Sequence, residues 1–208
     1  MVLSAGVAAA QTVSVEQLAH HAPAAAAREY RATLKALGDG DLARSIEHCR
    51  KAIDADPANA WAHNDLGVLY SGNERYADAL TEFRLALGLQ PSLFEAMVNA
   101  SYASLALGRA TDAESLARTA IEIRASDRHA NLLLGWSLVA QHQYTSAALD
   151  SLRIAARDFP EARLAEADVL MHQGSPDAAR TAVEAYLATG NVEHRPLAET
   201  WLRLLKFE

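Results

Sequence analysis

Small and apolar side chains recur along this chain at a constant interval of 34 residues. Segments 43–57 and 77–91 align without a gap and share small or apolar residues at several positions, and segment 111–125 follows the same pattern. The matched positions of the first two segments are Ser45 with Ala79, Ile46 with Leu80, Cys49 with Phe83, Ala52 with Ala86, Ile53 with Leu87 and Pro57 with Pro91. The third copy continues the pattern with Ala113, Ala117, Ala120 and Ile121, and the fourth with Ala147 and Ile154. Their spacing of three or four residues predicts amphipathic helices, and the long constant interval predicts a stack of repeated units.

The other half of each interval repeats as well, because Leu66-Gly67 matches Ala100-Ser101 and Leu134-Gly135. Turn-forming residues separate the two halves at Gly38-Asp39-Gly40, Gly72-Asn73, Gly108 and Gly174-Ser175-Pro176. Pro57, Pro91 and Pro160 are placed to end the second helix of their units. Each unit is therefore predicted to be a hairpin of two helices, a first helix A and a second helix B.

Gly67 supports close packing of the two helices in a hairpin. A glycine inside a helix costs about 1 kcal/mol relative to alanine, so its place in this Ala-rich and Leu-rich chain needs a reason. A small residue on helix A lets helix B approach, and a core void costs about 24 cal/mol per Å³. The small residues expected to pack in this way are Gly67, Ser101 and Gly135 on A helices, and Ala79, Ala86, Ala113, Ala120 and Ala147 on B helices.

These features resemble the tetratricopeptide repeat family. The family pattern is W-x2-L-G-x2-Y, then A-x3-F, then P. The best copy here reads His63-x2-Leu66-Gly67-x2-Tyr70, then Ala79-x3-Phe83, then Pro91, and it lacks only the leading Trp. The resemblance covers roughly residues 26–190. It implies an all-α, right-handed α-α superhelix of about four to five helical hairpins with a concave groove.

The same pattern divides the chain into expected segments. Units are placed near 26–59, 60–93, 94–127, 128–160 and 161–190, the last only after a shift in register. Residues 191–208 are expected to form a C-terminal capping helix, because an array needs its last apolar face covered. A short helix is expected over 13–23. Residues 1–12 resemble the end of a secretory signal peptide, with Ala8-Ala9-Ala10 before Gln11.

Composition excludes several classes of function. The net charge of −7 and the lack of a basic run argue against nucleic-acid binding. No apolar stretch approaches the roughly 20 residues that span a bilayer. Cys49 is the only cysteine, so it forms no intrachain disulfide, and a buried structural thiol is expected.

The sequence offers no catalytic or metal-binding constellation. Its eight histidines include the adjacent pair His20-His21, but no H-E-x-x-H motif and no ligand-like spacing. His48, His63, His129, His142, His172 and His194 are expected to be solvated or to line a groove. There is no Gly-rich phosphate loop and no nucleophile elbow. We therefore expect a protein without enzymatic activity, metal or cofactor.

The remaining A-helix positions are expected to line the groove and to bind a peptide. They are Tyr30, Arg31, Leu34, Trp61, Asn64, Asp65, Val68, Glu95, Val98, Asn99, Tyr102, His129, Leu132 and Trp136. Asparagine can pair with both a donor and an acceptor of a peptide backbone, and tryptophan and tyrosine are good anchors. Asp65 and Asn99 are expected to lie side by side, and Trp61, Glu95 and His129 to form a row. The alternative is that Tyr102, Leu132 and Trp136 pack between neighbouring A helices.

One specialised role within the family is disfavoured. Repeats that bind acidic chaperone tails hold a carboxylate with Lys, Asn, Asn, Lys and Arg on successive A helices. The matching positions here are Tyr30, Leu34, Asp65, Glu95 and Asn99, and none agrees with that set.

The leading hypothesis is thus a non-catalytic scaffold that binds a protein or peptide in its groove. One alternative is a self-associating module whose groove is filled by its own N-terminal segment or by a neighbouring chain, which would make it a homo-oligomer. Another is an accessory domain of a multi-protein enzyme complex. The leader-like N-terminus suggests export, as to a bacterial periplasm, and an Ala-rich tail of a cytoplasmic protein is the alternative.

Overall fold

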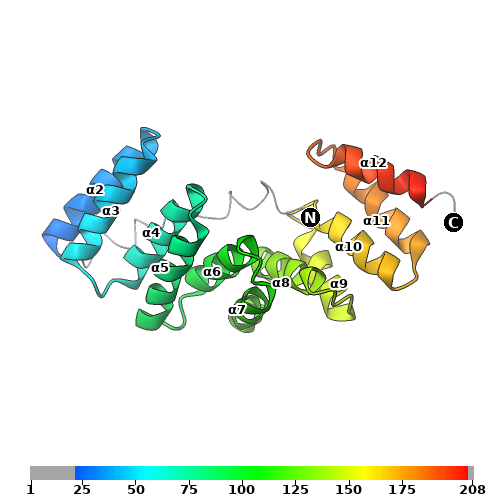
Figure 1. Cartoon of the computed structure of the whole chain (residues 1–208), viewed down its shortest axis with the longest axis horizontal. Coiled ribbons are helices and arrows are strands. Elements are labelled where there is room, and N and C mark those ends of the chain that lie inside the picture. Colours follow the sequence, from blue (N-terminus) through cyan, green and yellow to red (C-terminus); the bar gives the residue numbers. More distant parts are fainter. Residues whose placement is uncertain (1–21, 206–208) are drawn as a thin grey trace. The chain divides into compact units, whose positions relative to one another are not determined.

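The chain folds entirely as helices in the part that the structure describes. The computed structural model describes residues 22–205, and this range holds eleven α-helices and no strand (Figure 1). They are α2 (Ala24–Gly38), α3 (Leu42–Ala55), α4 (Ala60–Gly72), α5 (Tyr76–Leu89), α6 (Phe94–Ala106), α7 (Ala110–Ile123), α8 (Arg128–Ala140), α9 (Ser146–Ala155), α10 (Ala162–His172), α11 (Pro176–Ala188) and α12 (Arg195–Leu204). The all-α class expected from the sequence is confirmed.

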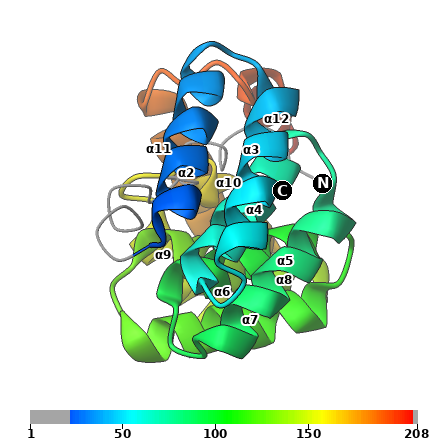
Figure 2. The same ribbon diagram turned by 90° about the vertical axis from the view of Figure 1, so that its left-hand side faces the viewer.

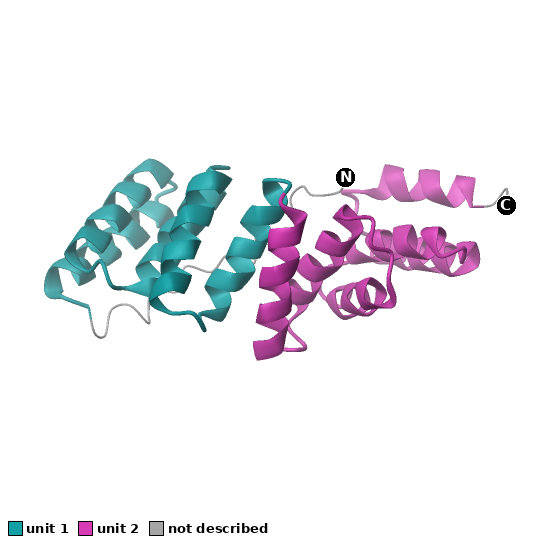
Figure 3. Ribbon diagram, turned by 60° about the horizontal axis from the view of Figure 1, so that its bottom comes forward, with its two compact units in different colours: residues 1–108 teal, residues 109–208 magenta. Residues whose placement is uncertain are grey.

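The chain divides into two compact units, residues 1–108 and 109–208, which Figure 3 colours separately. The predictions for residues 1–12 and for most of the helix over 13–23 lie outside the described residues. Ala22 and Pro23 are described, and they precede α2 without being helical. The division of the chain into five repeats stays a prediction.

Unit 1 contains two helical hairpins followed by α6. α2 lies against α3 and α4 against α5, and Figure 2 shows the first pair side by side. α3 also packs on α4, and α5 packs on α6, so α3, α4 and α5 each contact at least two neighbouring helices. Side-chain caps fix where helices begin: the Asp41 carboxylate accepts from the Arg44 amide at 3.0 Å, and the Asn59 amide oxygen accepts from the Trp61 amide at 3.1 Å.

Unit 2 follows the same plan. α8 pairs with α9 and α10 with α11, while α7 packs on α8 and α9 packs on α10. α12 lies against α11. The Asp127 carboxylate caps α8 by accepting from the Ala130 amide at 2.9 Å.

The two hairpin glycines have the close neighbours that the sequence predicted. A Cβ atom on Gly67 would lie 2.5 Å from Cε1 of Phe83, and one on Gly135 would lie 2.6 Å from Cδ2 of Leu152. Phe83 and Leu152 are fully buried, so neither can move aside into solvent. Helix A must therefore carry no side chain at these two positions for helix B to pack at this distance. Cys49 is buried as expected, and burial raises the pKa of its thiol well above its usual range.

The prediction that Ala147 packs inside the fourth hairpin is wrong. Ala147 is exposed, and Ala148 is buried in its place. The residue that contacts the hairpin glycine is also displaced by one position, since Phe83 follows Gly67 by 16 residues and Leu152 follows Gly135 by 17. The connection between α8 and α9 has five residues, whereas the connection between α4 and α5 has three. Leu152 is the seventh residue of α9 and Phe83 the eighth of α5, so the net shift is one residue.

The turns after successive A helices share one backbone feature. Four residues spaced 34 apart have positive φ: Gly40 at 75°, Glu74 at 57°, Gly108 at 72° and His142 at 58°. This left-handed conformation ends the helix and satisfies its last carbonyls. Glycine adopts it freely, whereas Glu74 and His142 adopt it at a cost.

Candidate protein-binding faces

An amide pair ties α4 to α6 in unit 1. The Asn99 Nδ2 atom donates to the Asn64 Oδ1 atom at 3.0 Å, and Asn64 Nδ2 donates to the Asp65 carboxylate at 3.4 Å. Asn64 and Asp65 are almost fully buried, and Asn99 is 6% exposed. The Asn99 amide is therefore bonded to Asn64, which in turn bonds the adjacent Asp65. These hydrogen bonds lie inside the unit, which makes the two amides part of its structure.

Trp61 on α4 packs against two separate buried clusters. It lies against one buried cluster that includes Ala26, Tyr30 and Ala62, and against a second that includes Ala86 and Leu93. Part of the indole remains accessible. Its packed side fixes its orientation, which is what an anchor for a partner requires.

Tyr102 on α6 is held by a second tyrosine. Its ring lies 5.9 Å from that of Tyr76 in an edge-to-face arrangement, with 79° between the planes. Burial and the hydrogen bond with Tyr76 raise the pKa of the Tyr102 phenol to about 12. The hydroxyl is therefore neutral at physiological pH, and the ring is partly accessible.

Two histidines expected to be solvated or groove-lining instead join the helices of unit 1. His63 Nδ1 lies 2.8 Å from the Glu82 carboxylate, and its Nε2 lies 3.3 Å from the Pro57 carbonyl oxygen. His48 Nδ1 lies 2.8 Å from the Glu29 carboxylate. Both imidazoles are therefore used in the packing of A against B helices.

In unit 2, His129 stands at the start of α8 against an aromatic ring. Its imidazole lies 4.5 Å from the ring of Phe159, and burial lowers its pKa. It also lines an open surface depression of about 550 Å³ together with Arg124, Ser126, Asp127, Arg128 and Asp158. An ion pair between Arg128 and Asp158 spans this depression, so its charges are largely matched within the protein.

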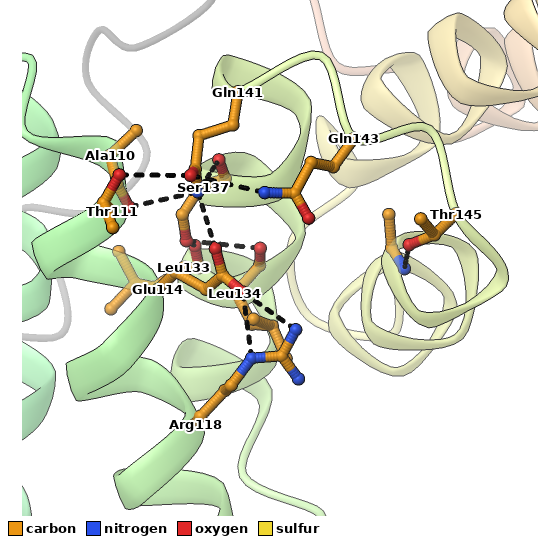
Figure 4. Close-up of polar contacts among 11 residues, drawn as sticks. Ala110, Thr111, Glu114, Arg118, Leu133, Leu134, Ser137, Gln141, Gln143 and Thr145 are labelled. Atoms are coloured by element: carbon orange, nitrogen blue, oxygen red, sulfur yellow. Dashed lines mark hydrogen bonds and ion pairs between the residues drawn. The ribbon is translucent and has the colours of Figure 1, made fainter.

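A glutamine at the end of α8 connects that helix to α7 (Figure 4). The Gln141 Nε2 atom donates to the Glu114 carboxylate at 2.7 Å, and its Oε1 accepts from the Thr111 hydroxyl at 3.1 Å. Arg118 holds the other oxygen of Glu114 at 2.9 Å. This network fixes α8 in place and occupies polar groups that would otherwise face solvent.

No metal site or membrane span emerges from these residues. Within residues 22–205, no group of three or more His, Cys, Asp or Glu side chains is placed to hold a metal ion. None of the described helices is long and apolar enough to cross a bilayer.

Family models for the tetratricopeptide repeat match two stretches of the chain, residues 48–81 and 132–193. Solved structures with the same fold include a MamA protein, with a TM-score of 0.72 and 18% identity over 79% of this chain and 91% of that chain. The structural match shows the fold, and the two family-model matches identify the repeats.

The chain is a tetratricopeptide repeat protein.

Two further similarities bear on this tetratricopeptide repeat (TPR) protein. YrrB, described as a TPR protein with an unusual peptide-binding site, aligns with a TM-score of 0.65 and 17% identity over 75% of this chain and 81% of that chain. Cellulose synthase operon protein C of Pseudomonas fluorescens (strain SBW25) is 29% identical over 188 residues. That match takes in 88% of this chain but only 14% of the longer protein.

The predicted groove residues of this TPR protein fall into two equal groups. Seven are buried: Tyr30, Asn64, Asp65, Val68, Val98, Asn99 and Leu132. Seven are accessible at least in part: Arg31, Leu34, Trp61, Glu95, Tyr102, His129 and Trp136. For Leu132 the structure agrees with the alternative of packing, whereas Tyr102 and Trp136 keep accessible surface.

Sequence reasoning missed the interactions that join different repeats of the TPR protein. The Arg153 guanidinium on α9 holds the buried Glu166 carboxylate on α10 at 2.8 Å, and Tyr144 stacks on His172 with ring centroids 3.7 Å apart. Neither pair is repeated 34 residues away in the sequence, so the repeat pattern does not predict these contacts.

Proposed function

We propose that this TPR protein is a non-catalytic scaffold that binds a segment of another protein through the accessible side chains of its A helices. The observation that carries the proposal is their recurrence at one repeat position. Positions 34, 68, 102 and 136 are equivalent in the repeat. Leu34, Tyr102 and Trp136 keep accessible surface there, whereas the smaller Val68 is buried. The residues just before them, Thr33, Ser101 and Gly135, are buried.

The chemistry of these side chains suits recognition of a protein. Trp61 and Tyr102 are aromatic anchors held by packing, so little rotamer freedom is lost when a partner binds. Arg31 and Leu34 are exposed on α2 and add one charge and one apolar contact. The buried amides Asn64 and Asn99 serve as the support beneath this surface.

A second candidate function comes from the similarity to the cellulose synthase operon protein. The match covers most of this chain but a small part of that protein. The repeats would then act as an accessory module of a multi-protein enzyme complex, again without catalysing a reaction. Both proposals require a protein partner.

The test begins with a random peptide library displayed on phage and selected on the full chain. A selected peptide is then synthesised, and its affinity for variants is measured by fluorescence anisotropy. Leu34→Ser is the test variant, because Leu34 is 41% exposed and lies on an A helix. Leu85→Ser is the matched control, because Leu85 is 48% exposed but lies on the B helix α5.

We expect Leu34→Ser to weaken binding by about fivefold or more and Leu85→Ser to leave it unchanged, because truncating a hot-spot side chain costs more than 1 kcal/mol. Equal affinity for the two variants would argue against the A-helix surface. A chain that dimerises by sedimentation velocity, and loses the dimer in Leu34→Ser, would instead indicate self-association.

A further inference from the structure

A small pocket lies between α10 and α12 in unit 2. Its walls are Asp168 and Met171 from α10, Trp201 and Leu204 from the end of α12, and Leu205 directly after that helix. Its volume is about 220 Å³. None of these residues belongs to the A-helix set predicted from the sequence. The pocket therefore goes beyond the proposed function.

The volume limits what the pocket can hold. Sites for small molecules and cofactors measure about 300–1,000 Å³, whereas a closed apolar cavity of about 150 Å³ holds benzene. A space of about 220 Å³ lies between these values. It therefore suits one large side chain of a partner rather than a free cofactor.

The lining is apolar apart from a single carboxylate. Leu204 is 66% exposed, Met171 and Trp201 are partly exposed, and a methionine can adjust its shape to an entering group. The Asp168 side chain is 32% exposed. Its carboxylate lies 3.4 Å from His172 Nδ1, which donates a shorter hydrogen bond of 2.9 Å to the Asp168 backbone oxygen. Because a carboxylate has about four acceptor positions, Asp168 can still receive a donor from a partner.

We infer that this pocket docks one large apolar side chain from a protein segment that carries lysine or arginine beside it. The apolar side chain contacts Met171, Trp201 and Leu204. The neighbouring cation pairs with Asp168, and the net charge of −7 favours the approach of a basic segment. An acidic or phosphorylated segment would place like charges together at Asp168.

The experiment uses three synthetic peptides with blocked ends: GSKLKSG, GSELESG and GSKSKSG. Binding to the ¹⁵N-labelled full chain is followed through the indole N–H resonance of Trp201. The chain has three tryptophans, and Trp201→Phe assigns the signal. We expect GSKLKSG to shift this resonance with a Kd on the order of 1 mM, since one side chain and one exposed ion pair give modest affinity. The other two peptides should bind at least about threefold more weakly.

Variants separate the two parts of the pocket. Leu204→Ser should weaken the binding of GSKLKSG by about tenfold. Val192→Ser is the control and should leave that binding unchanged, because Val192 is similarly exposed but lies in a loop outside the pocket. Asp168→Asn should weaken it by about threefold and remove the preference over GSELESG. Asp177→Asn on α11 is its control, because that carboxylate is also exposed.

Three results would overturn the inference. Equal binding of all three peptides would show that neither the apolar group nor the charge is recognised. Binding only after deletion of residues 206–208 would show that the chain fills its own pocket. A dimer that Leu204→Ser abolishes would show that a second copy does so. Leu34→Ser separates this inference from the proposed function, because it should leave GSKLKSG binding unchanged.

Discussion

The imidazole of His63 on α4 lies 2.8 Å from the carboxylate of Glu82 on α5. One repeat earlier, the same two positions hold Glu29 on α2 and His48 on α3, also 2.8 Å apart. The residues at each position are 34 apart, so successive hairpins join their helices with the same ion pair in opposite orientation. We therefore expect the folding stability of unit 1 to depend on pH.

We expect Glu82→Gln to change this pH dependence. The hydrogen bond with Glu82 raises the pKa of His63 above 6.5, with a smaller contribution from the Pro57 carbonyl, although burial opposes it. Because the folded pKa exceeds the unfolded one, the stabilisation is fully present below pH 6.5 and is lost as pH rises through the folded value. Melting temperatures between pH 5 and 9 should fall less steeply in Glu82→Gln than in the wild type.

An NMR titration of His63 provides the direct measurement. Its pKa should move toward the ordinary value of about 6.5 in Glu82→Gln. His129 is the internal reference, because burial and not this ion pair sets its pKa. An unchanged His63 titration would contradict the assignment.

Gly67→Ala should destabilise the protein although alanine favours helix. The added methyl group would overlap the buried Phe83 ring, and overpacking of this kind costs about 1–3 kcal/mol. Gly67→Leu should loosen the hairpin further. Gly88→Ala on α5 is the control, because a Cβ there meets nothing within 4 Å. Urea denaturation should show the first variant less stable and the control no less stable than the wild type.

Glu74→Gly should stabilise the protein by about 1 kcal/mol, since glycine removes the cost of a left-handed residue. Asn73→Gly is the control, because it tests whether a glycine at a neighbouring turn position also stabilises the protein. Asn73 has a φ of −102°, so glycine there should only add disorder to the unfolded chain and lower stability. Thermal melts of the two variants should shift in opposite directions.

Asn99→Leu should cost about 1–3 kcal/mol, because Asn64 then loses its buried partner. The double variant Asn64→Leu/Asn99→Leu should lose less than the sum of the single changes. A double-mutant cycle from urea denaturation measures this coupling. Strict additivity would mean that the amide pair contributes nothing.

The sequence predicted the helices and the hairpin glycines well because both follow from local spacing. Gly67 and Gly135 show this clearly, since each has the close helix B partner that a small residue implies. Ala147 shows the limit, because a longer turn moved the buried position to Ala148 and no periodic pattern marks such an insertion.

Burial and long-range contacts were harder to predict. Asn64, Asp65 and Asn99 are polar, so the sequence predicts an open groove for them. They are buried instead, and the hydrogen bonds that link them explain why burial is tolerated. The pocket joins Asp168 to Trp201 and Leu204, which are more than thirty residues away in sequence. Only the packing of α12 brings them together.

The extra residue between Gly135 and Leu152 means that the hairpins are not interchangeable parts. A chimera cut at fixed intervals of 34 residues would present the transplanted B helix rotated by about 100° about its axis. Engineers who shuffle these repeats should therefore join them at matched core contacts instead of matched counts of amino acids.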